Sequence, residues 1–125
     1  MANILVVEDM AGVQLAISSM LRRAGHTVVI AANGEQGIAQ LKQATFELVI
    51  TDMLMPGVDG TEVLVGVLAM PNRPPVIAMS GGGAGVSAEA ALLAAKVNAD
   101  AFLQKPFEKA DLLAVVDRLL AKSAA

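Results

Sequence analysis

Short apolar runs alternate with helical patterns along the whole chain, and this alternation limits the fold more than any other feature. Five runs have the length and residue types of buried strands, and each is followed by a stretch of helical character. The expected strands are residues 3–7, 26–31, 48–51, 76–79 and 101–104, and the expected helices lie within residues 10–24, 33–44, 59–69, 88–99 and 108–121. Strict alternation with short connections predicts an α/β fold with a parallel five-stranded sheet and helices on both faces.

The five strand–helix units fill residues 1–125, so we expect a single domain without a linker. Two residues mark helix boundaries inside it. Gly25 is expected just past the end of the first helix, where a left-handed backbone conformation is common. Asn33 has the side chain of an N-cap for the second helix.

Composition excludes several classes of function. The chain has no cysteine, which excludes a disulfide framework and a cysteine-based metal site or nucleophile. Its net charge is −3 with no long run of Lys or Arg, so we expect no direct nucleic-acid partner. There is no basic leader and no stretch of the roughly 20 apolar residues that a membrane span needs. We therefore expect a cytoplasmic protein with no membrane contact.

Polar residues gather where the expected strands end. Ligand sites of parallel sheets lie at the carboxyl ends of the strands, near the point where strand order reverses. The strands that end there lead into Glu8 and Asp9, Asp52, Ser80, and Lys105. Three carboxylates at neighbouring strand ends repel one another, and a divalent cation with a preference for oxygen ligands, such as Mg²⁺, relieves that repulsion.

With these residues on the same rim, the chain resembles a response regulator receiver domain, the module of two-component signalling that accepts phosphate on an aspartate. The resemblance rests on "VVEDM" for the acidic pair, "DMLMPGVDG" for the phosphoacceptor and its turn, "MSG" for the hydroxyl residue, and "FLQKPF" for the lysine–proline pair. These pieces occur in the family's order over essentially the whole chain. The resemblance implies a flavodoxin-like (βα)5 fold with strand order 2-1-3-4-5.

The resemblance also implies roles for the residues that carry the chemistry. Asp52 is expected to be the phosphoacceptor, which takes a phosphoryl group from a phosphohistidine, while Lys105 and Ser80 stabilise the charge that develops during transfer. The family's lysine is aimed by a cis peptide bond, here at Pro106. The protein would then be no enzyme for a separate substrate, but a signalling phosphoacceptor that promotes its own phosphorylation and dephosphorylation.

The metal site and the switch follow from the same resemblance. Mg²⁺ would be held by the acidic pair Glu8 and Asp9, by Asp52, and by the main-chain carbonyl of Leu54. Ser80 and the aromatic residue Phe102 would form the switch that responds to phosphorylation. The expected partners are a sensor histidine kinase or a histidine phosphotransfer protein, and a downstream protein or second copy. The latter would bind the surface of helix 4 (expected within residues 88–99), strand 5 (residues 101–104) and helix 5 (expected within residues 108–121).

Two other functions remain open at this point. One is a flavodoxin-like cofactor binder, although the loop "EDMAGVQ" is acidic where such a protein needs a hydroxyl-rich phosphate loop. The other is a scaffold of receiver shape that binds partners without being phosphorylated. A lone Asp52 would be read as a turn residue, and only its coincidence with the other strand-end residues favours the receiver function.

Overall fold

The computed structural model describes residues 2–53, 60–80, 99–105 and 107–124, and these contain five strands and four helices. The strands are β1 (Asn3–Val7), β2 (Thr27–Ala31), β3 (Leu48–Asp52), β4 (Val76–Ser80) and β5 (Ala101–Gln104). The helices are α1 (Ala11–Arg23), α2 (Gly34–Gln43), α3 (Gly60–Leu68) and α5 (Lys109–Ala124). The helix expected at residues 88–99 stays a prediction, because residues 88–98 lie outside the described part of the chain.

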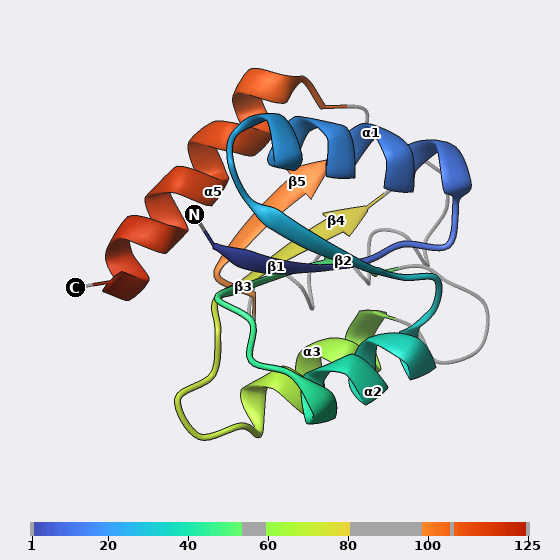
Figure 1. The fold of residues 1–125 in the computed structure, drawn as a ribbon. Coiled ribbons are helices and arrows are strands. Elements are labelled where there is room, and N and C mark those ends of the chain that lie inside the picture. Colours follow the sequence, from blue (N-terminus) through green and yellow to red (C-terminus); the bar gives the residue numbers. More distant parts are fainter. Residues whose placement is uncertain (1, 54–59, 81–98, 106, 125) are drawn as a thin grey trace.

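All five strands are parallel and follow the order β2-β1-β3-β4-β5, which confirms the predicted fold. The chain moves from β1 to β2 on one side and then crosses to β3 on the other side, so the order reverses between β1 and β3. Figure 1 shows α1 and α5 above the sheet and α2 and α3 below it. The layers and the reversal point therefore agree with the alternation in the sequence.

Each face of the sheet has its own hydrophobic core, because successive strand residues point to opposite faces. On β1, Ile4 and Val6 pack in the cluster that contains the buried residues of α1 and α5. Leu5 and Val7 pack in the second cluster, which contains those of α3. The four residues from Ile4 to Val7 are fully buried, which explains why β1 is a continuous apolar run.

The helix boundaries that the sequence predicted are confirmed for α1 and α2. Gly25 has a φ of 96°, a left-handed conformation that suits glycine just past the end of α1. The Asn33 side chain accepts a hydrogen bond from the Gln36 backbone N–H at 2.9 Å. The Gln36 side chain in turn accepts one from the Ala32 backbone N–H at 2.8 Å, so two donors at the start of α2 are satisfied.

An ion pair ties the beginning of edge strand β5 to β4. Asp100, one residue before β5, accepts hydrogen bonds from both terminal nitrogens of Arg73, at 2.9 and 3.2 Å, and from the Val76 backbone N–H at 2.8 Å. Burial alone would raise the pKa of Asp100, but these donors outweigh it and lower the pKa. The charged carboxylate is thus stabilised where β5 joins the sheet.

Within the described ranges, no helix combines the length and the apolar character that crossing a membrane requires.

At Gly37, helix α2 packs closely on β1. A Cβ added there would lie 2.8 Å from Cγ2 of Val7 and 3.3 Å from its Cγ1. Val7 is fully buried, and its branched side chain has little freedom to turn away. Only glycine therefore lets α2 lie at this distance from β1.

We predict that Gly37→Ala lowers the free energy of unfolding by about 1–3 kcal/mol, the usual effect of overpacking a core. Gly66→Ala in α3 is the matched control, because a Cβ at Gly66 meets no atom within 4 Å. That variant should be as stable as the wild type or more stable by up to about 1 kcal/mol, since alanine favours helix. Urea unfolding measures both, and equal stability of the two variants would contradict the tight contact.

Candidate functional site

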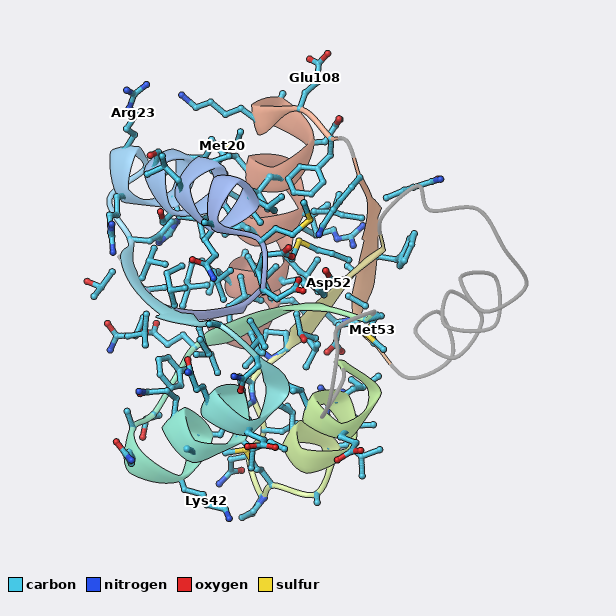
Figure 2. All side chains as sticks on the ribbon, turned by 90° about the vertical axis from the view of Figure 1, so that its right-hand side faces the viewer. Met20, Arg23, Lys42, Asp52, Met53 and Glu108 are labelled. Atoms are coloured by element: carbon cyan, nitrogen blue, oxygen red, sulfur yellow. The ribbon has the colours of Figure 1, made fainter. Side chains whose placement is uncertain are left out.

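The polar residues expected at the strand ends come together at one edge of the sheet. The register pairs Val7 of β1 with Thr51 of β3, so the following residues, Glu8 and Asp52, are also neighbours. Lys105 comes directly after β5 and reaches the same point from the other side of β4. Figure 2 looks onto this edge and shows Asp52 between the helix layer of α1 and α5 and that of α2 and α3.

Strand alternation explains why these side chains can meet. Ile4 and Val6 of β1, Ile50 of β3 and Leu103 of β5 all belong to the core on the α1 and α5 side. Continuing each strand in steps of two assigns Glu8, Asp52 and Lys105 to that same side. One face of the sheet thus delivers two carboxylates and an ammonium group to its end.

Lys105 joins the two buried carboxylates. Its Nζ donates hydrogen bonds to Oε2 of Glu8 at 2.7 Å and to Oδ2 of Asp52 at 3.0 Å. The exposed fraction of the side chain is 0% for Glu8, 6% for Asp52 and 14% for Lys105. The two ion pairs are therefore largely shielded from water. Electrostatic interactions are stronger in such a buried environment than at the surface.

Asp9 completes an acidic cluster with Glu8 and Asp52. Each of the three offers a carboxylate oxygen, and these oxygens all lie within 4.8 Å of one another. Asp9 is exposed, whereas the other two are buried. The cluster therefore opens to solvent on the Asp9 side.

The charges in the cluster are unbalanced. Burial raises the pKa of Glu8 above its usual value, and repulsion from Asp52 adds to this, while the hydrogen bond from Lys105 acts in the opposite direction. Burial would lower the pKa of Lys105, but its bonds to Glu8 and Asp52 prevail and raise it. Among the described residues of the cluster there are thus one ammonium and three carboxylates, so negative charge is in excess there.

This donor set is suited to a hard divalent cation. Mg²⁺ takes oxygen ligands, commonly one or two carboxylates completed by water and phosphate oxygens. An exposed carboxylate beside two buried ones offers such oxygens and leaves the solvent side accessible. The acidic triad thus fits the metal that the sequence predicted.

Other residues of the predicted site are only partly described. The backbone of Ser80 ends β4 in register with Gln104, but its side chain lies outside the described part. Phe102 is half-buried against the core on the α2 and α3 side. Leu54 and Pro106 lie outside the described residues, so the carbonyl ligand and the cis peptide stay predictions.

Gln14, which was not predicted from the sequence as a site residue, contacts the acidic turn. Its side-chain nitrogen Nε2 donates a hydrogen bond to the main-chain carbonyl of Glu8 at 2.6 Å. Gln14 lies within the helix expected in residues 10–24, and helical character alone does not indicate what a polar side chain contacts. The available signal is the start of α1, where Met10 is the N-cap but makes no side-chain capping bond.

An apolar groove of about 430 Å³ lies next to the site, along α1. Five residues of α1 line it, together with Lys105 and Phe107. On the same helix Leu15 is 68% exposed, and Met10 just before it is 60% exposed. A molecule that approaches Lys105 from this side therefore meets an apolar surface.

Comparison with known families and proteins gives a consistent result. The family model described as "Response regulator receiver domain" matches residues 4–117. The response regulator protein FleR of Pseudomonas aeruginosa is 35% identical over 117 residues, which cover 94% of this chain and 24% of FleR. The transcriptional regulatory protein ZraR of Escherichia coli K12 is 33% identical over 119 residues, which cover 95% of this chain and 26% of ZraR. The chain thus spans about a quarter of the length of these curated relatives.

A solved structure supports the same likeness in three dimensions. The receiver domain of the sensor histidine kinase PA1611 from Pseudomonas aeruginosa PAO1 superposes with a TM-score of 0.85 at 28% sequence identity. The match covers 96% of this chain and 98% of that one. That structure has a magnesium ion coordinated in its active site cleft.

Proposed function

The chain belongs to the response regulator receiver domain family, and we propose that it accepts a phosphoryl group on Asp52 from a phosphohistidine donor in two-component signalling. The observation that carries this proposal is the contact of Lys105 with both Asp52 and Glu8. Phosphoryl transfer depends mainly on positioning and on stabilisation of negative charge, and a buried carboxylate beside a lysine and an exposed acid can supply both.

In the proposed reaction a carboxylate oxygen of Asp52 attacks the phosphorus of the donor. A new P–O bond forms as the P–N bond breaks, and the electron pair of that bond returns to the imidazole of the donor. Lys105 already contacts Asp52 and would stabilise one phosphoryl oxygen, and the Ser80 hydroxyl would stabilise another. The protein contributes position and charge and acts on no separate substrate.

A divalent cation fits this chemistry. We propose that Glu8, Asp9, Asp52 and the main-chain carbonyl of Leu54 hold Mg²⁺, which supplies positive charge for the transferred phosphoryl oxygens. The acidic triad and the magnesium in the PA1611 receiver domain support this assignment.

The proposal extends to partners and setting. The donor would be a sensor histidine kinase or a histidine phosphotransfer protein, and residues 1–125 would act as one receiver domain in the cytoplasm, with no direct contact to nucleic acid or membrane. A downstream protein or a second copy would bind helix 4, strand 5 and helix 5.

The test of acceptance uses acetyl phosphate as a small donor, with intact-mass measurement of the 125-residue chain. Wild type should gain one phosphoryl group with Mg²⁺ and none with a chelator, and Asp52→Asn should gain none. Asp117→Asn is the matched control, because Asp117 is an exposed acid on α5, and it should behave as wild type. Equal labelling of Asp52→Asn would refute the acceptor, and failure of wild type to be labelled would favour a scaffold that works without phosphorylation.

We also propose that Ser80 and Phe102 transmit the signal. A phosphoryl group on Asp52 gives the Ser80 hydroxyl a charged acceptor, a hydrogen bond of about 1.5–3 kcal/mol. If Ser80 moves inward, Phe102, which is now half-buried, can take a more buried position and remodel the partner face.

NMR spectra with and without beryllofluoride, a phosphoryl mimic, test this route. In wild type the shift changes should extend from the strand ends to helix 4 and β5, and in Ser80→Ala they should stay at the strand ends. Identical responses of the two proteins would exclude Ser80 as the link.

A further inference from the structure

We propose that Gln14 is a positioning residue for the divalent cation: its side-chain amide holds the turn that carries Asp9 to Asp52, and so sets the affinity of the acidic triad for the metal. This inference rests on the cation site proposed above. It concerns a residue that touches no carboxylate oxygen of the triad in any described contact.

The acidic triad requires a turn between Glu8 and Asp9. Successive residues of a strand point to opposite faces, so two neighbouring carboxylates cannot share a site while the strand continues. Glu8 still follows the sheet, because its backbone N–H donates to the Ala31 carbonyl at 3.0 Å. Yet its carboxylate and that of Asp9 lie within 4.8 Å of each other, so the change of direction falls at the peptide that joins them.

Gln14 holds this peptide. The carbonyl of Glu8 belongs to the planar unit that links Glu8 to Asp9, and it accepts the hydrogen bond from Nε2 of Gln14 at 2.6 Å. Fixing the orientation of a peptide plane restricts the dihedral angles on both sides of it. The bond therefore restricts the direction in which Asp9 leaves the backbone.

A closed ring of hydrogen bonds fixes Gln14 itself. Its backbone N–H donates to the Met10 carbonyl at 2.9 Å, and the Met10 N–H donates to Oε1 of Glu8 at 3.3 Å. The ring thus runs from the Glu8 side chain through Met10 and Gln14 back to the Glu8 carbonyl. The buried carboxylate of Glu8 and the peptide that leads into the exposed Asp9 are thus both held by hydrogen bonds at the beginning of α1.

A purely structural role for Gln14 would have a different consequence. Asp9 is exposed, so releasing it removes little packing, whereas the cation loses a correctly placed ligand. Loss of the Gln14 amide should therefore weaken cation binding more than it weakens the fold. Residues behind metal ligands commonly change affinity by about 10- to 100-fold when substituted.

The test compares Gln14→Met with Gln40→Met. Methionine keeps the unbranched shape and helix preference of glutamine but has no donor, and Gln40 is a half-buried glutamine on α2. Titration of the metal-free proteins with MgCl₂, followed by NMR shifts, gives the dissociation constant, and urea unfolding in chelator gives the stability. We expect Gln14→Met to raise the dissociation constant about tenfold and Gln40→Met to leave it unchanged.

A double-mutant cycle with Asp9→Asn separates positioning from a general effect. If Gln14 acts through Asp9, Gln14→Met should have no further effect on Mg²⁺ affinity once Asp9 is neutralised. An unchanged dissociation constant in Gln14→Met, or an equal loss with and without Asp9, would overturn the inference. Gln14→Asn, which keeps the amide but is too short to reach, should match Gln14→Met and serves as the second variant should that one fold poorly. Wild type that binds no Mg²⁺ would overturn the cation site itself, and the role of Gln14 with it.

Discussion

One interaction governs this site: two buried carboxylates, Glu8 and Asp52, share the single ammonium group of Lys105. Burying a charge is unfavourable unless it is paired, and in the part of the site that the structure describes one cation is shared by two neighbouring anions, with Asp9 adding a third at the surface. Burial raises the pKa of Glu8, and repulsion from Asp52 adds to this despite the hydrogen bond from Lys105. The site is therefore held in a state that gains from further positive charge, which a divalent cation would supply.

The sheet makes this arrangement possible. Parallel strands in register bring their ends to one edge, and alternation assigns Glu8, Asp52 and Lys105 to the α1 and α5 side. On the opposite face, Gly37 lets α2 lie directly on Val7 of β1. The largely buried central strands β1, β3 and β4 thus form a support on which a few polar groups are held against their mutual repulsion.

The fold could be predicted because its signals are local: apolar runs, short connections, Gly25 after α1 and Asn33 before α2. The strand-end residues could be predicted as a group, since parallel strands end at one edge. Which of these residues are buried and which are exposed could not be predicted. Glu8 and Asp9 are adjacent acids, and which one is buried depends on where β1 stops following the sheet. The role of Gln14 could not be predicted either. Its partner is a backbone carbonyl, and a contact of this kind leaves no residue pattern in the sequence.

The most direct measurement is the stability of the metal-free protein with and without the charge of Glu8. Because the folded state raises the pKa of this carboxyl, folding favours its uncharged form, and Glu8→Gln imitates that form while Asp52 remains to pair with Lys105. Urea unfolding in chelator at neutral pH should therefore find Glu8→Gln more stable than wild type. A clearly less stable Glu8→Gln would show that the ion pair outweighs the repulsion, and would contradict the account.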